Sequence, residues 1–212
     1  MGVRQIGARV HRVEDENLIR GEGKYLDDIQ LPNMVYAAFL RSSMAHAKIS
    51  ITDVEAAQSL PGVKAVFTYD TLPSSLVSKT QLETYPAPII KQSMLPDLLA
   101  NDEVAHVGQA IAMVIASSRH IAEDACELIQ VDYQALTPVV DVLEAAKPNS
   151  QLTHSTLKDN IAASIETKFG NVETAFAECE DSIELSFKQH RGGCHSMECR
   201  GVLGDWQQQL GE

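Results

Sequence analysis

Residues 103–133 constrain the fold more than any other stretch of this chain. Residues 110–116 form a short, wholly apolar run between polar residues, which is typical of a β-strand covered on both faces. Ser117 or Ser118 then offers a hydroxyl that can cap the first free N–H groups of a helix. Apolar residues recur there at three- and four-residue steps: Ile121, Ala122, Ala125, Leu128 and Ile129. Residues 130–133 are again β-prone, so the stretch predicts a strand–helix–strand unit.

A second unit of the same kind precedes it. Residues 35–40, 48–51 and 63–68 have the composition and alternation of strands. Thr52 and Glu55 have the spacing of a capping box, which predicts a short helix from there through Leu60. Residues 69–101 contain four prolines among polar residues, so we expect a long loop with one short turn near residues 96–99.

The carboxyl-terminal part reads differently. Asn171 is expected to cap a short helix with an apolar stripe of Val172, Ala175, Phe176 and Cys179. Residues 182–190 alternate apolar and polar side chains and predict a strand, which resumes at residues 202–206. A strand that runs into a turn without a return strand leaves an open edge. We therefore expect residues 166–212 to be the start of a second domain.

Composition limits the classes of partner and compartment. The 212-residue chain carries a formal net charge of −12, which disfavours binding to nucleic acid or to anionic membranes. No apolar run reaches the ~20 residues of a membrane span, and the N-terminus lacks the apolar core of a signal peptide. We therefore expect a cytoplasmic protein. The four cysteines form no Cys-x-x-Cys pair, so neither a disulfide framework nor a zinc or iron–sulfur site is predicted.

Two features invite a ligand-binding interpretation. Gly21 and Gly23 resemble part of a phosphate loop, but the third glycine is missing and no apolar strand precedes the pair. Asp27 and Asp28 would also repel phosphate, so turn glycines are the better interpretation. Residues 190–200 hold the densest group of reactive side chains. That group is compatible with a zinc site, a cysteine nucleophile or a structural turn, and its spacing favours the turn.

The remaining candidates are weaker. His46 and His106 are lone histidines beside strands, for which we expect hydrogen-bonded structural roles. The acidic pairs 14–15 and 27–28 are sequence neighbours, whose side chains point apart on a strand and suit two-carboxylate catalysis poorly. The sequence therefore predicts no catalytic, cofactor-binding or metal-binding residue in this chain.

An ordered series of motifs nevertheless resembles the N-terminal part of the large, molybdenum-binding subunit of the molybdenum hydroxylases. That family comprises xanthine dehydrogenase, aldehyde oxidase and aerobic carbon monoxide dehydrogenase. The motifs are Arg12-Val-Glu-Asp15, Gly21-x-Gly-x-Tyr-x-Asp-Asp28, Arg41-Ser-Ser-Met-Ala-His-Ala-Lys-Ile49, Leu60-Pro-Gly-Val-x-Ala-Val66, Val107-Gly-Gln-x-Ile-Ala112, Ala122-Glu-Asp-Ala125, Val131-Asp-Tyr133 and Met197-Glu-x-Arg-Gly201. Together they cover nearly the whole chain.

The resemblance implies an α+β chain with an N-terminal arm at residues 1–19 and an α/β-hammerhead domain at residues 20–142. A linker at 143–165 and the start of a molybdopterin-binding domain at 166–212 would follow. Such enzymes hydroxylate a carbon centre or oxidise carbon monoxide at a molybdenum–molybdopterin cofactor, and pass electrons through 2Fe-2S clusters to FAD on partner chains or domains.

The family's cofactor-contacting glutamine, glycine-rich loop and catalytic glutamate lie beyond this sequence. The resemblance therefore implies part of an oxidoreductase subunit that is inactive alone and has no cofactor of its own. Its implied partners are the remainder of the molybdenum subunit, an FAD-binding subunit and an iron–sulfur subunit. The alternative is a non-catalytic module that binds or assembles subunits.

Overall fold

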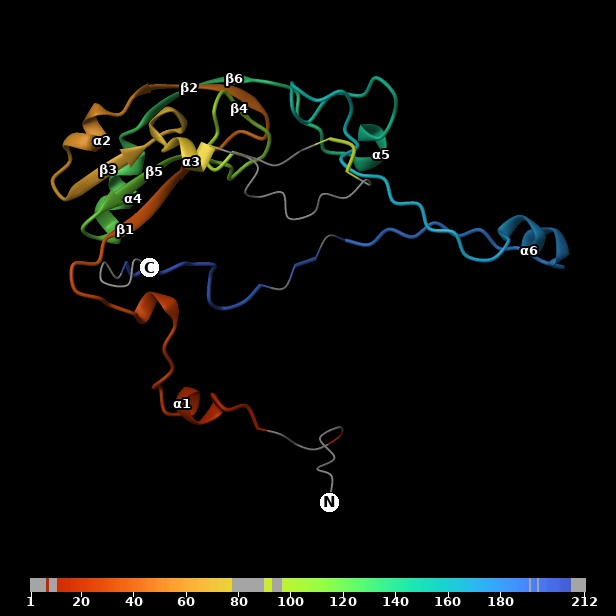
Figure 1. Cartoon of the computed structure of the whole chain (residues 1–212), viewed down its shortest axis with the longest axis horizontal. Helices are drawn as coiled ribbons and strands as arrows, with labels where there is room; N and C mark the ends of the chain where they lie inside the picture. Colours follow the sequence, from red (N-terminus) through yellow and green to blue (C-terminus); the bar gives the residue numbers. More distant parts are fainter. Residues whose placement is uncertain are drawn as a thin grey trace. The chain divides into compact units, whose positions relative to one another are not determined.

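A computed structural model describes residues 7, 11–77, 90–92, 97–190, 192–193 and 195–206 of the chain (Figure 1). The chain divides into two compact units. The larger unit is Val35–Glu178, and the smaller combines Met1–Met34 with Cys179–Glu212. Among the described residues, every helix is too short or too polar to cross a lipid bilayer.

In its described residues, the larger unit has two three-stranded antiparallel sheets. The first has the order β1–β5–β3, and the second β4–β2–β6. The bounds are β1 Tyr36–Arg41, β2 Ala47–Asp53, β3 Val63–Phe67, β4 Glu103–Val104, β5 Ala110–Ala116 and β6 Gln130–Ala135. The α+β class and strands β1, β2, β3, β5 and β6 confirm the sequence predictions, whereas β4 was not predicted. The two strands of each strand–helix–strand unit, however, lie in different sheets.

Two helices cover one face of the first sheet. They are α2 (Glu55–Ser59) and α4 (Arg119–Glu127), and Figure 1 shows α4 lying across the strands. Ala122 and Ala125 of α4 are fully buried with Val114 of β5 in one core cluster. Alanine on this face lets the helix approach the strands closely, so the predicted apolar stripe is confirmed there. Leu128 is an exception, because the helix ends at Glu127 and leaves its side chain 39% exposed.

The first residues of α4 and α2 show whether the two predicted helix caps form. Ser118 caps α4, since its Oγ accepts a hydrogen bond from the Ile121 N–H at 3.3 Å. The predicted capping box at Thr52 is wrong. Thr52 lies in β2, and its hydroxyl donates to the Gln130 carbonyl of β6. The start of α2 is instead satisfied by Asp53, whose Oδ1 accepts from the Glu55 N–H at 2.8 Å.

A second core cluster lies under the β4–β2–β6 sheet. It consists of Ala47, Ile49, Ala100, Val104 and Ile111. Within the predicted loop of residues 69–101, the structure has a 3₁₀ turn, η2 (Tyr69–Thr71), and a short helix, α3 (Ser74–Val77). The predicted turn near residues 96–99 lies partly outside the described residues; residues 98–99 form a bend whose Leu99 is buried.

Residues 142–165 are irregular but closely hydrogen-bonded. After α5 (Val142–Ala145), the Asn160 side chain donates to the carbonyls of Ala145 and Gln151 and accepts from the Thr153 N–H. Further on, the Asn171 Oδ1 accepts from the Thr174 N–H at 3.1 Å, which confirms the predicted cap of α6 (Val172–Glu178). The apolar stripe of α6 is exposed, with no buried residue in the helix.

The smaller unit contains α1 (Asp15–Ile19) and a 3₁₀ turn, η1 (Leu26–Asp28). Gly21 closes α1 in the left-handed region, at φ +72°. Its N–H donates to the Leu18 carbonyl, and the Glu22 N–H donates to that of Asn17 at 2.8 Å. This is a Schellman motif, so the first of the two glycines is a turn residue as predicted.

The strands predicted at residues 182–190 and 202–206 are not present. Neither range forms a strand in the structure, and Ile183, Leu185 and Phe187 have exposed side chains. Alternation alone does not make a strand, because the backbone needs a neighbouring strand for its hydrogen bonds. No described residue pairs with either range as a strand.

Candidate functional site

The carboxylate of Glu103, in β4, gathers three hydrogen bonds in the larger unit. Its Oε1 accepts from His46 Nε2 at 2.7 Å and from the Ser155 N–H at 2.9 Å. Its Oε2 accepts from Lys48 Nζ at 2.8 Å. One side chain thus connects two strands and a segment 52 residues further along the chain. We call these four residues the Glu103 network.

Strand register explains this convergence. Lys48 in β2 lies directly opposite Glu103 in β4, so the two form a cross-strand pair of opposite charge. His46 is two residues before Lys48, so both side chains emerge on the same face. Asp102 adds a second carboxylate to Lys48, with 3.1 Å between Oδ2 and Nζ.

His46 is buried between two acceptors. Its Nδ1 lies 3.0 Å from the carbonyl oxygen of Thr137, which can only accept, so Nδ1 is the donor in that bond. Its Nε2 faces the carboxylate of Glu103. When both ring nitrogens carry a proton, this second contact is a charge-assisted hydrogen bond. The predicted hydrogen-bonded structural role of His46 is confirmed.

The surroundings of Glu103 determine its charge. Burial alone would raise the pKa of its carboxyl group. The hydrogen bonds from Lys48, His46 and the Ser155 backbone outweigh burial and lower the pKa to about 2. The same contact with Glu103 raises the pKa of Lys48, against the opposing effect of burial. Glu103 is therefore ionised at neutral pH and serves as a fixed acceptor.

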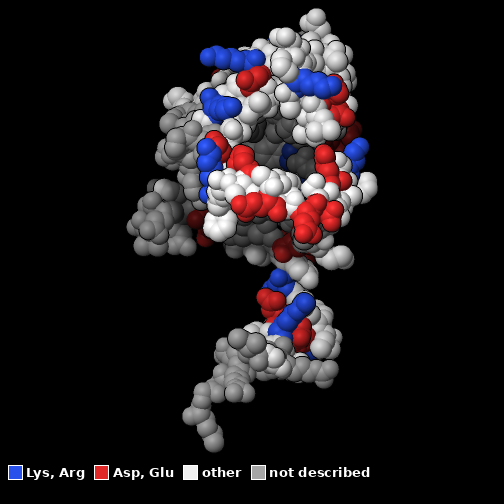
Figure 2. Space-filling model, turned by 90° about the vertical axis from the view of Figure 1, so that its right-hand side faces the viewer, with Lys and Arg blue, Asp and Glu red and all other residues white. Residues whose placement is uncertain are grey.

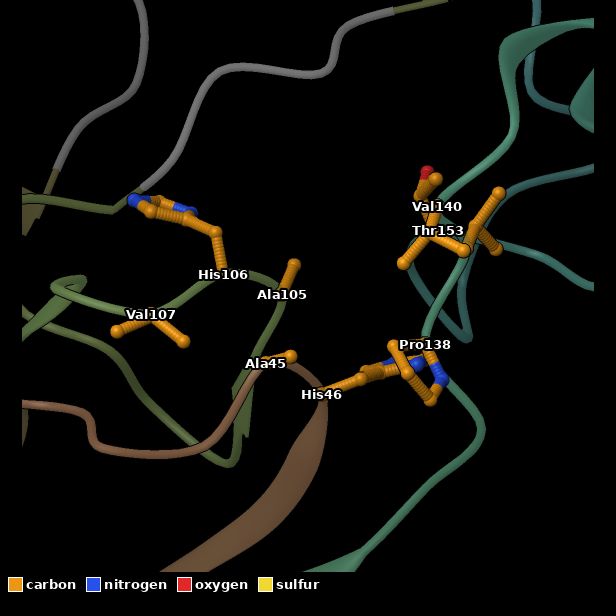
Figure 3. Close-up of a pocket in the computed structure, with 9 residues that line it drawn as sticks. Ala45, His46, Ala105, His106, Val107, Pro138, Val140 and Thr153 are labelled. Carbon is orange, nitrogen blue, oxygen red and sulfur yellow. The ribbon is translucent and has the colours of Figure 1, made fainter.

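A shallow cavity of about 180 Å³ adjoins this network (Figure 3). Its lining comprises Ala45, His46, Ala105, His106, Val107, Pro138, Val139, Val140 and Thr153. Figure 3 shows the rings of His46 and His106 pointing away from each other, with Ala45 and Ala105 between them. His106 is exposed. The two histidines therefore do not form a paired acid and base across this cavity.

The reactive group at residues 190–200 lies in the smaller unit. Arg191 and Cys194 are outside the described residues, and the described members are exposed. The Oε1 of Glu198 accepts from the Leu26 N–H at 2.8 Å, which ties this segment to the start of η1. Gly201 lies against the Leu26 side chain, where an added Cβ would collide with it. These contacts support the structural-turn interpretation, although Glu198 binds the backbone of Leu26 and not a crossing between strands.

One carboxylate of each acidic pair accepts a local backbone hydrogen bond. Asp15 Oδ2 accepts from the Arg12 N–H, and Asp28 Oδ2 accepts from the Tyr25 N–H at 2.9 Å. Within the described parts of the chain, no three His, Cys, Asp or Glu residues are grouped so that they could hold a metal ion. On the face that Figure 2 draws, acidic and basic side chains are interspersed without a continuous basic surface.

Sequence reasoning missed the Glu103 network. Its members are far apart in the chain, and only the register of β2 with β4 brings them together. The alternating His46 and Lys48, set against the acidic pair Asp102 and Glu103, were the available signal. That signal becomes specific only when the two strands are known to be neighbours.

Comparison with known proteins identifies the fold. The family model "Aldehyde oxidase and xanthine dehydrogenase, a/b hammerhead domain" matches residues 20–137. The chain belongs to this family. It is 34% identical over 209 residues to the nicotine 6-hydroxylase large subunit of Paenarthrobacter nicotinovorans, covering 95% of this chain and 24% of that protein. The family member described here thus spans about a quarter of that relative.

Solved structures of related enzymes also match this chain. Quinoline 2-oxidoreductase from Pseudomonas putida 86 matches 74% of this chain with 38% identity and a TM-score of 0.63, and 20% of that chain is covered. A Cu,Mo-CO dehydrogenase structure matches 82% of this chain with 34% identity and the same TM-score, and 23% of that chain is covered. The matched region corresponds to the N-terminal, hammerhead-containing part of the large subunits, as the sequence motifs predicted.

Proposed function

We propose that this chain is the hammerhead-containing portion of a molybdenum hydroxylase large subunit and serves as a scaffold within that subunit. The observation that carries the proposal is the family match over residues 20–137, combined with coverage of only 24% of the nicotine 6-hydroxylase large subunit. In the complete enzyme, the reaction would be hydroxylation of a carbon centre or oxidation of carbon monoxide.

The metal-ligating side chains of this chain indicate which part of the enzyme would hold the cofactors. The described residues offer no cluster of three metal ligands, and Cys126 is buried while Cys179 and Cys199 are exposed. The described residues therefore show no ligand set for an iron–sulfur cluster. We place molybdopterin on the rest of the large subunit, with FAD and the 2Fe-2S clusters on partner subunits.

The role that we infer for this chain is structural. The two sheets, joined through shared core residues such as Leu40 and Ile51, form one packed body. The Glu103 network fixes residue 155 against the β4–β2 edge of that body. On this proposal, the scaffold holds the remainder of the large subunit in position, and the isolated chain is inactive. The domain boundaries at residues 19, 142 and 165 remain part of the same proposal.

Metal analysis and a dye-reduction assay on the purified chain test this function. Substoichiometric molybdenum is expected, with no dye reduction in the presence of xanthine, nicotine or carbon monoxide. Stoichiometric molybdenum or turnover by the chain alone would contradict the proposal.

A second assay measures binding of the chain to the part of the nicotine 6-hydroxylase large subunit outside the matched region. We expect a complex to form. If the chain instead binds the smaller subunits of that enzyme and ignores the rest of the large subunit, a stand-alone assembly module is the correct function.

A further inference from the structure

The β1–β5–β3 sheet has apolar residues on both faces, and among the described residues α2 and α4 cover one of them. Both helices that make its main contacts, α2 and α4, pack with the cluster that contains Val114 and Ala116. The intervening residues of β5, Met113 and Ile115, point to the opposite side of the sheet. Neither belongs to a core cluster.

The strand register defines the surface on that opposite side. Phe39, Met113 and Phe67 lie side by side across the three strands. Ala37, Ile115 and Ala65 form the next row. We call these six residues the far face. Phe39 in particular is 42% exposed, although it occupies a strand position in a sheet.

Arg41 borders the far face and gives it a polar edge. Its guanidinium lies over the ring of Phe39, 5.4 Å from the centroid, and donates one hydrogen bond to the Gly108 carbonyl at 2.9 Å. A guanidinium has five N–H donors, which suit bidentate binding of a carboxylate. The far face therefore combines aromatic and aliphatic side chains with a cation that donates one hydrogen bond among the described residues.

We propose that the far face is the interface on which the rest of the large subunit packs, through an apolar surface that carries a carboxylate opposite Arg41. This inference rests on the proposed function. A strand as uniformly apolar as β5 is typical of a sheet covered on both faces, and the second core cluster covers only its Ile111 end. About three quarters of the nicotine 6-hydroxylase large subunit lies outside the matched region and is available to cover the remainder.

A second copy of this chain is a less suitable occupant. Two copies would each bring a net charge of −12 to the contact and repel each other. The rest of the large subunit need not carry the same net charge.

The test compares two lysine substitutions at side chains of similar exposure. Phe39→Lys places a charge on the far face, whereas Leu128→Lys places one at the end of α4, where the side chain is 39% exposed. The probe is the part of the nicotine 6-hydroxylase large subunit outside the matched region. We expect Phe39→Lys to weaken its binding at least about tenfold and Leu128→Lys by less than about twofold. Circular dichroism checks that both variants keep the fold.

Met113 provides a second readout without any substitution. Its oxidation by hydroxyl radicals, followed by mass spectrometry of the peptide, should fall when the probe is bound. Equal binding of the Phe39→Lys variant, or unchanged Met113 oxidation in the complex, overturns the proposed interface while leaving the proposed function intact. Self-association of the wild-type chain that Phe39→Lys abolishes would assign the far face to a second copy. Failure of the wild-type chain to bind the probe overturns the proposed function as well.

Discussion

At the scale of single residues, Glu103 connects three separate segments of the larger unit. It is a nearly buried carboxylate whose oxygens accept from His46, Lys48 and the Ser155 backbone. If one partner is removed from a buried, hydrogen-bonded set, the remaining polar groups lose their partner. The free energy of unfolding then falls by more than the contribution of the single hydrogen bond that was lost.

We expect Glu103→Gln to lower the free energy of unfolding by about 2 kcal/mol, because the neutral amide has one acceptor oxygen for the donors of His46, Lys48 and Ser155. Urea unfolding near neutral pH measures the change. Glu123→Gln is the matched control, since Glu123 forms an exposed pair with Arg119 and should change stability by less than about 0.5 kcal/mol. Equal effects of the two substitutions would contradict a special role for the network.

The lowered pKa of Glu103 also predicts how stability depends on pH. The carboxyl pKa falls from 4.5 in the unfolded chain to about 2 in the folded one. The resulting stabilisation is complete above 4.5 and is lost as the pH falls from there towards 2. The stability difference between wild type and Glu103→Gln should therefore shrink between about pH 5 and about pH 3. A difference that stays constant over this window would show that the folded-state pKa is not lowered.

Gly62 occupies a position where any other residue would be strained. It adopts φ +97°, and a Cβ there would lie 2.8 Å from Ile121 Cδ1 and 2.9 Å from Ser117 Oγ. Gly62→Ala should cost about 2–3 kcal/mol of unfolding free energy, from backbone strain and this collision together. Gly170→Ala, at φ +66° with nothing near its Cβ, should cost only about 1 kcal/mol. Thermal unfolding of both variants separates strain from collision, and equal losses would exclude the collision.

At the scale of elements, the start of α4 gives a direct test of capping. The sequence left Ser117 and Ser118 as equal candidates, and the structure assigns the cap to Ser118. Ser118→Ala should lower the free energy of unfolding by about 1 kcal/mol, whereas Ser117→Ala should change it by less than about 0.5 kcal/mol. Denaturant titration of both variants measures the difference, and the reverse order would move the cap to Ser117.

The sequence predicts features that depend on residues close together in the chain, and it does not predict features that depend on distant residues. β5 and the buried face of α4 depend on local periodicity, so residues 110–116 and 121–125 were predictable. The division of the strands into two sheets depends on pairing between distant segments, which no local pattern encodes. The same limit hid the Glu103 network and made the alternation at residues 182–190 misleading. Thr52 failed as a cap for a related reason, because β2 extends through it to pair with β6.

At the scale of the whole molecule, the exposed carboxyl-terminal segment predicts a contrast in hydrogen exchange. Amides of β2 and β5 lie in central strands of the two sheets and should exchange slowly. Residues 182–190 form no strand and should exchange at the rate of an unstructured peptide in the isolated chain. Exchange measured by mass spectrometry checks both. Slow exchange at residues 182–190 in the isolated chain would favour the stand-alone assembly module.

The antiparallel pairing also has a consequence for biosynthesis. Tyr36 of β1 pairs with Ala116, which is synthesised 80 residues later, and Lys48 of β2 pairs with Gln134. At a translation rate of roughly 5–20 residues per second, β1 would remain without its neighbour for about 4–16 s. During that interval its apolar side chains are open to any chaperone near the ribosome. Codon choice between β3 and β5 could therefore set how long the nascent chain stays vulnerable to aggregation.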